Sequence, residues 1–297
     1  MQTRLQPVIT AVCLGVIIAL IAFQPKAEAE ENGQPPTNNI PYLAQAIELG
    51  YESGLTNIVD LTHTSQIHIK AGNQNFDALA QYQPLLDSAA PDDGILTVGT
   101  NVRQYKQEYN YFSTIYDRSQ KPDFDQYMTV FILLSLANES AHRQQHLNGS
   151  LADYLEYMNH QNPVSACTLY ALQQHVSDVL MIDNALKIQN YFLGHGYASG
   201  IRALHLVLEK MEVKNAFDEM QKAMTKHNSA ALKAAMHSLY LSRLKANMSP
   251  RPECRNVTTT RLENRIYKRA IEPAQTLFSL AYTTKDTMPE TRTSPNQ

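Results

Sequence analysis

Three side chains of one long apolar segment could together bind a metal ion. Glu139, His142 and His146 follow one another at spacings of three and four residues, so in a helix they share one face. Imidazole and carboxylate groups at this spacing can reach one divalent transition metal such as Zn²⁺. His160 and His175 are candidates to complete the ligand set. The pattern predicts a metal-binding protein, or an enzyme whose ion activates water.

The same residues have a structural interpretation. A helix that ends at Gly149 would place His142 and His146 near the negative end of its dipole, and Glu139 would pair with Arg143. The chain contains no Gly-x-Ser-x-Gly motif, phosphate loop or Gly-x-Gly-x-x-Gly motif. The sequence therefore leaves enzymatic activity open and favours a protein that acts by binding.

Two further polar groups are candidates for a site. His175 and Asp178 lie one helical turn apart and could form a base with its orienting carboxylate, or simply lie at the surface. His195 stands between Gly194 and Gly196, which predicts either an accessible backbone near a ligand or two helix ends. We expect Gly194 to cap one helix and Gly196 to open the next.

Charge is distributed unevenly in a chain whose net charge is −3. Residues 30–200 hold 18 acidic and 7 basic side chains, whereas residues 201–297 hold 9 acidic and 16 basic ones. A basic surface of this kind favours an acidic protein partner or an anionic membrane, or it packs against the acidic half of the chain. The residues expected on it are Lys222, Lys226, Lys233, Arg243 and Lys245.

Two other observations bear on the partner. Nucleic acid is disfavoured because arginine and aromatic residues do not cluster. The tyrosine-rich segment 105–127 is a second candidate surface for a protein partner, or it lies at the edge of the core. Residues 229–248 form a basic amphipathic helix, which predicts either peripheral membrane association or a core-facing helix with a solvated basic face.

The first residues have the pattern of a secretory signal peptide. A basic start is followed by an apolar run from Val8 to Phe23 and by the small-x-small triplet ending at Ala29, which predicts cleavage of residues 1–29. An uncleaved membrane anchor is the alternative. The pattern predicts export to a periplasm or to the cell exterior. In such an oxidising compartment Cys167 and Cys254 could form one disulfide.

Hydrophobic periodicity predicts a mainly α-helical protein, either an antiparallel bundle or an irregular helical array. Two or three short strands are expected near residues 55–100, within 55–69 and 95–98. The expected helices span 40–51, 76–89, 102–118, 123–146, 150–160, 164–193, 197–212, 215–227, 229–246 and 259–282.

The predicted organisation follows from these elements. Polar, proline-containing ends predict a flexible linker over 30–39 and a disordered tail over 283–297. Between them, residues 40–282 form a helical domain, as one unit or as an acidic subdomain 40–200 and a basic subdomain 201–282. The sequence thus predicts an exported, soluble helical protein that binds a protein partner.

Overall fold

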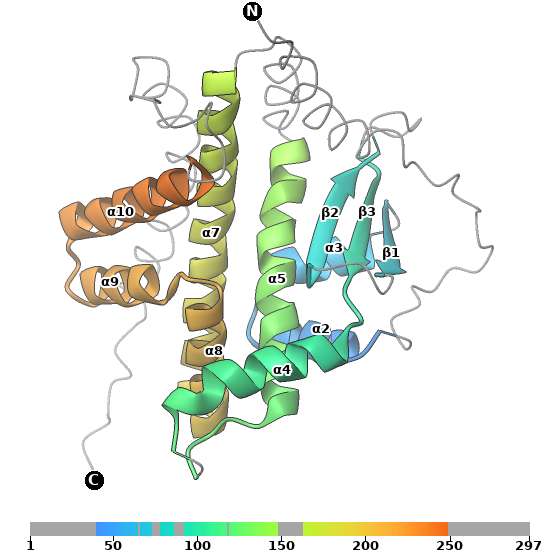
Figure 1. The fold of residues 1–297 in the computed structure, drawn as a ribbon, viewed down its shortest axis with the longest axis vertical. Helices are drawn as coiled ribbons and strands as arrows, with labels where there is room; N and C mark the ends of the chain where they lie inside the picture. Colours follow the sequence, from blue (N-terminus) through green and yellow to red (C-terminus); the bar gives the residue numbers. More distant parts are fainter. Residues whose placement is uncertain are drawn as a thin grey trace, which may run out of the picture. The chain divides into compact units, whose positions relative to one another are not determined.

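The computed structural model describes residues 40–64, 66–72, 78–85, 92–117, 119–147 and 163–248. They form a mainly α-helical fold with a small three-stranded mixed sheet (Figure 1), as the sequence predicts. The helices are α2 (Leu43–Glu52), α3 (Thr56–His63), α4 (Val102–Phe112), α5 (Phe124–Leu147), α7 (Pro163–Gly194), α8 (Ala198–Lys210), α9 (Lys214–Thr225) and α10 (Ser229–Met248), with a short 3-10 turn η2 (Ser113–Ile115). The strands are β1 (Ile67–Ala71), β2 (Ala80–Pro84) and β3 (Gly94–Val98).

Helix α5 occupies the centre of these elements. Its residues 130–137 are all buried, because they are apolar on nearly every face apart from Ser135, whose hydroxyl donates to the Phe131 carbonyl. Helix α7 lies antiparallel along one side of α5, and the sheet lies on the other side (Figure 1). Polar contacts fix the register of the two helices, since Asn138 Nδ2 donates to Ser177 Oγ at 2.9 Å and Gln145 Nε2 donates to the Gln173 carbonyl at 3.0 Å.

The sheet brings strand β2 next to α5. Its order is β1-β3-β2, with β1 parallel and β2 antiparallel to the central β3. Tyr82 of β2 pairs with Leu96, and a Cβ at Gly94 would collide with the Tyr82 ring. Gly94 therefore allows this ring to lie close to β3. As an edge strand, β2 has a backbone side that β3 does not pair, and α5 approaches it there.

Two sequence-based predictions in this region were wrong. Residues 80–84 form β2 where a helix over 76–89 was expected, and Pro84 would have removed a hydrogen bond from that helix. Thr56–His63 forms α3 within the stretch 55–69, where short strands were expected, and only the end of that stretch, from Ile67, lies in β1. In α3 the buried side chains of Ile58 and Leu61 recur at helical spacing, so burial of that face outweighs the low helix propensity of its β-branched residues.

Four helices end in the same hydrogen-bonded turn. After α7, the Tyr197 amide donates to the Phe192 carbonyl and the Gly196 amide to the Leu193 carbonyl, which is the Schellman pattern. The residue in the left-handed conformation is Gly196 at φ 68°. The expectation that Gly194 caps α7 was therefore wrong, since Gly194 is the last helical residue. The corresponding positive-φ residues after α2, α8 and α9 are Gly54, Glu212 and His227.

Several predictions lie outside the described residues. These are the signal peptide 1–29, the linker 30–39, the helices 150–160 and 259–282, and the tail 283–297. Among the helices that the structure describes, none combines the length and the apolar character needed to cross a membrane.

Candidate functional site

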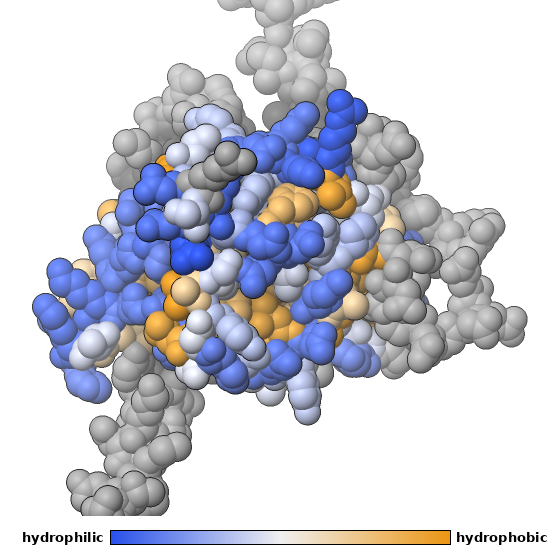
Figure 2. Space-filling model, turned by 90° about the horizontal axis from the view of Figure 1, so that it is seen from below, coloured by the Kyte–Doolittle hydropathy of each residue, from blue (hydrophilic) through white to orange (hydrophobic). Residues whose placement is uncertain are grey.

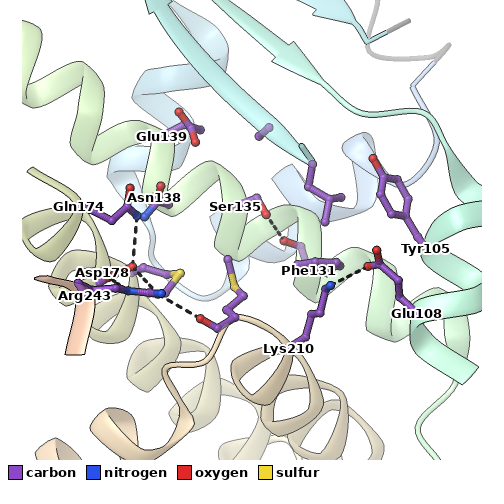
Figure 3. A pocket seen from close by; sticks show the side chains of 14 residues that line it. Tyr105, Glu108, Phe131, Ser135, Asn138, Glu139, Gln174, Asp178, Lys210 and Arg243 are labelled. Carbon is purple, nitrogen blue, oxygen red and sulfur yellow. Dashed lines mark hydrogen bonds and ion pairs between the residues drawn. The ribbon is translucent and has the colours of Figure 1, made fainter. Parts of the chain in front are cut away.

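A cavity of about 290 Å³ lies where α5 faces β2 on one side and α7, α8 and α10 on the other (Figure 3). Its apolar wall includes Leu79, Phe131 and Met181. Its polar residues are Glu108, Ser135, Asn138, Glu139, Gln174, Asp178, Lys210 and Arg243. The size is near the lower end of the range of about 300–1,000 Å³ that is usual for small-molecule sites.

Among the acidic and basic side chains of this wall, Glu139 alone forms no ion pair with another described residue. Its Oε2 accepts a hydrogen bond of 2.6 Å from the Tyr82 amide on the free side of β2. Burial raises the pKa of Glu139 to about 8, although the bond from the Tyr82 amide opposes part of this rise. At neutral pH the carboxyl group is therefore mainly protonated. Because Oε2 is the acceptor, the proton belongs on Oε1, and Glu139 can act as a hydrogen-bond donor.

His146 also contacts Tyr82, through the side chain instead of the backbone. The Tyr82 hydroxyl oxygen lies 2.7 Å from His146 Nδ1. Burial raises the pKa of Tyr82 to about 12, so the phenol keeps its proton. Burial lowers the pKa of His146. Two of the three residues predicted as metal ligands thus meet at one tyrosine of β2.

The other predicted ligands point elsewhere. His142 Nδ1 lies 3.0 Å from Gln145 Oε1 within α5, and burial lowers the pKa of His142. His175 is fully buried on α7, where its ring lies 5.7 Å from that of Tyr240, and burial lowers its pKa to about 3. His160 lies outside the described residues. Within the described residues, no three His, Cys, Asp or Glu side chains come together as a metal site.

Metal binding by Glu139, His142 and His146 stays a prediction. Elemental analysis of the chain purified without chelator tests it directly. Bound metal that disappears in a His142→Ala/His146→Ala variant would support a metal site that includes these histidines, with His160 as a candidate further ligand.

On the α7 side of the cavity, Asp178 and Arg243 form a bidentate ion pair. Arg243 Nε lies 2.6 Å from Asp178 Oδ2, Nη2 lies 3.3 Å from Oδ1, and Nη2 also donates to the Met211 carbonyl at 3.1 Å. Burial raises the pKa of Asp178, and the Arg243 guanidinium opposes this rise. Arg243 was expected on an exposed basic surface. It instead fastens α10 to α7 and to the residue that follows α8.

A second ion pair lies on the opposite side of the cavity. Lys210 Nζ lies 3.1 Å from Glu108 Oε2, and each side chain is about a quarter exposed, at 27% and 26%. Lys210 also lies 5.3 Å from the centre of the Phe112 ring. The two ion pairs flank the cavity, with Ser135 between them and Glu139 beyond it (Figure 3). In each of these ion pairs, the charge of one side chain is thus neutralised by its partner.

The chain matches no known family model, curated protein or solved structure. The site is therefore interpreted from its geometry alone.

Of the remaining predicted binding residues, three are described by the structure and the others lie outside the described part. Lys222, Lys226 and Lys233 are exposed on α9 and α10, and no ion pair between described residues involves them. The side chain of Lys245 is outside the described part, as is any Cys167–Cys254 disulfide.

The tyrosine-rich segment is mostly part of the core. Tyr105, Tyr109 and Tyr127 are buried, whereas Tyr111 is 73% exposed. Tyr109 donates to the Pro122 carbonyl at 2.5 Å. These three tyrosines therefore support the interpretation as core-edge residues over that as an open groove.

Sequence reasoning missed the contacts that position residues of the cavity wall. Tyr82 contacts Glu139 across 57 residues of sequence, and Arg243 contacts Asp178 across 65. Such pairs have no characteristic spacing. The available signals were the single proline in the expected helix 76–89, which argues for an edge strand, and the buried character of the α5 stripe that carries Ser135 and Glu139.

Proposed function

We propose that this protein acts by binding a small, uncharged, polar organic molecule in the cavity between α5, β2 and α7. The observation that carries this proposal is that the Glu139 carboxyl group lines the cavity, accepts from the Tyr82 amide and forms no ion pair among the described residues, whereas the other charges of the wall are paired. A neutral, partly buried carboxyl group that already accepts from the Tyr82 amide has one donor left. A ligand oxygen or nitrogen is a suitable acceptor for it.

The charge balance of the wall supports an uncharged ligand. Asp178 is compensated by Arg243, and Glu108 by Lys210. A charged ligand would enter a partly desolvated space without an available counter-charge, and burial of an unpaired charge is costly. A neutral molecule loses only hydrogen bonds to water, which Glu139 and Asn138 can replace.

The apolar wall supports a ligand with a compact hydrocarbon part. Leu79, Phe131 and Met181 can cover such a part, and the volume of the cavity limits it to the size of a small metabolite. The signal-like segment 1–29 supports binding in a periplasm or outside the cell, because a cleaved signal peptide delivers the chain there.

The experiment compares ligand binding by variants of Glu139. Uncharged amides, ureas, nucleobases and sugars are screened by calorimetry against the purified full chain, beside charged molecules of similar size. Glu139→Gln keeps both an acceptor for the Tyr82 amide and a donor for the ligand, so we expect it to bind the best neutral compound within about threefold of wild type.

Glu139→Leu keeps the approximate size and removes both polar functions. We expect it to lose at least tenfold in affinity, as an unfulfilled hydrogen bond in a desolvated site costs about 1–3 kcal/mol. Glu219→Gln, which changes an exposed carboxylate of α9, serves as the matched control and should bind normally. Tight binding of charged compounds alone, or equal binding by Glu139→Leu, would contradict the proposal.

A second function, binding of an acidic protein partner, is favoured by a different observation. Lys222, Lys226 and Lys233 are exposed and take part in no ion pair among the described residues. Charge complementarity can steer such a partner to α9 and α10. Partner recovery in a pull-down should fall when the three lysines are changed to glutamate and persist when they are changed to arginine. Salt-sensitive binding to anionic vesicles by the wild-type chain would instead support the membrane alternative of residues 229–248.

A further inference from the structure

Three aromatic rings gather at the turn between α7 and α8. The rings of Tyr191 and His195 are 4.3 Å apart between centroids, and those of His195 and Tyr197 are 5.6 Å apart with planes at 26°. We call Tyr191, His195 and Tyr197 the aromatic cluster. It lies at the lower end of α7 in Figure 1 and includes none of the residues that line the cavity.

The aromatic cluster is held in place by the local backbone. His195 Nδ1 donates to the Tyr191 carbonyl at 2.8 Å, because a carbonyl oxygen can only accept. The Schellman turn with Gly196 at φ 68° then reverses the chain and sets Tyr197 beside His195. The rings are thus pre-organised even though they are not part of the core, since Tyr197 is 51% exposed and His195 is also exposed.

Carboxylates of α2 flank these rings. The Tyr191 hydroxyl donates to Glu52 Oε2 at 2.6 Å. That hydrogen bond raises the pKa of Tyr191 to about 12, followed by burial and by the charges of Glu52, Tyr197 and Glu48. Neither Glu48 nor Glu52 forms an ion pair with a residue that the structure describes. Among the residues that the structure describes, these two carboxylates near the aromatic cluster therefore have no basic partner.

This combination attracts a cation. The face of a tyrosine ring is negative, and a guanidinium group can stack on it while its N–H groups bond a carboxylate. The aromatic cluster lies at the surface, because Tyr197 is 51% exposed and His195 is also exposed. Figure 2, a view from below Figure 1, shows hydrophobic patches between hydrophilic residues on that face. Small ligands usually bury most of their surface in a concave site, so a site at the surface suits a side chain that a larger partner presents.

We propose that the aromatic cluster, with Glu48 and Glu52, binds an arginine side chain of a basic segment in another protein. The guanidinium plane stacks on Tyr197 and its N–H groups donate to Glu52. This site is separate from the cavity proposed for the small ligand.

The test uses fluorescence anisotropy of the full chain with three labelled peptides of the sequence Gly-X-Gly-X-Gly. X is arginine, lysine or citrulline, which has the shape of arginine without its charge. We expect the arginine peptide to bind more tightly than the lysine peptide and the citrulline peptide not to bind at low salt. Equal binding of the arginine and citrulline peptides would overturn the proposal.

Variants separate ring recognition from general hydrophobic contact. Tyr197→Phe retains the aromatic face and should retain binding, whereas Tyr197→Leu should weaken it by at least about threefold, the lower part of the cation–π range. Glu52→Gln should weaken it as well. Tyr111→Leu changes an exposed tyrosine of α4 and is the matched control, with no expected effect. Circular dichroism establishes that each variant is folded.

Two further outcomes would overturn the proposal. One is undiminished binding by Tyr197→Leu, which would indicate a non-specific electrostatic contact. The other is that free arginine amide competes at the same concentration as the arginine peptide, which would indicate a site for small cations instead of a protein partner.

Discussion

At the scale of single residues, Glu139 links the sequence pattern to the cavity. A glutamate in a buried helix stripe is costly when ionised, and here the Tyr82 amide donates a hydrogen bond to it. Its pKa is raised from 4.5 to about 8. The folded protein therefore holds a proton that the unfolded chain releases between these two pH values.

This proton makes the effect of Glu139→Gln depend on pH. At pH 4 glutamate is neutral in both states, and the variant should unfold with nearly the same free energy as wild type. From about pH 4.5 to about 8 wild type should lose stability relative to the variant, by at most about 1.4 kcal/mol per pH unit. The reason is that the unfolded chain has released this proton and must take it up again to fold. Above pH 8 the difference should level off. Guanidinium chloride unfolding of both proteins at pH 4, 6, 7 and 9 measures it.

The comparison between the two proteins cancels every other titrating group. Glu219→Gln, which changes an exposed carboxyl group of α9, is the control in the same measurements. A difference between wild type and Glu139→Gln that stays constant from pH 4 to 9 would mean that folding does not shift the pKa of Glu139.

The sequence identified part of this site for sound physical reasons. The three-and-four spacing placed Glu139, His142 and His146 on one helix face, and the structure confirms the helix that carries them. The spacing alone does not determine which residues contact that face. Tyr82 comes from an edge strand, and the contact depends on the packing of β2 against α5, which has no local signature in the chain.

At the scale of elements, helix ends show how little of the backbone conformation the sequence specifies locally. The Schellman turn recurs after α2, α7, α8 and α9, but only Gly54 and Gly196 have the residue type that favours it. Glu212 and His227 adopt left-handed φ angles of 58° and 50° in the same position. Packing of the helices on either side, rather than a glycine, imposes these turns.

The two glycines at the end of α7 should respond oppositely to alanine. A Cβ at either Gly194 or Gly196 meets no atom within 4 Å. Gly194→Ala should raise the free energy of unfolding by about 0.5–1 kcal/mol, because alanine favours the helix. Gly196→Ala should lower it by about 1 kcal/mol, because φ 68° is strained for alanine. Urea unfolding of the pair decides this, and changes of the same sign would contradict the turn.

Glu212→Gly tests the same turn from the other direction. Glu212 is exposed, so its side chain contributes little packing. We expect glycine to stabilise the protein by about 0.5–1 kcal/mol through relief of the left-handed φ of 58°. Thermal unfolding measures the gain. A loss of stability would show that the glutamate side chain stabilises the turn after α8.

Element types were predicted correctly where the apolar residues fit a helix over a long segment, and wrongly where a short segment also fits another element. α5 and α7 are long and apolar, so both were predicted within about two residues of their observed bounds. Segment 76–89 was assigned to a helix because Leu79 and Tyr82 also fit helical spacing. Pairing with β3 decides that region, and this pairing joins residues that are distant in sequence.

At the scale of the whole molecule, the opposite charges of the two halves are partly satisfied within the chain. Asp178 and Glu108 belong to the acidic range 30–200, and their partners Arg243 and Lys210 to the basic range 201–297. Three lysines of the basic range stay exposed outside these pairs. The charge asymmetry thus has an internal part, which joins helices, and an external part, which is available to a partner.

The buried pair should contribute far more to stability than an exposed one. Arg243→Leu would leave the Asp178 carboxylate buried at 2% side-chain exposure without its counter-charge, so we expect a loss of about 3–5 kcal/mol. Asp178→Asn/Arg243→Leu removes the stranded charge and should recover much of that loss. Lys187→Leu breaks a pair with Asp183 whose lysine is 45% exposed, and should cost less than about 1 kcal/mol. Guanidinium chloride unfolding of the four proteins measures these differences; if Arg243→Leu cost no more than Lys187→Leu, the ion pair would not be what fastens α10 to α7.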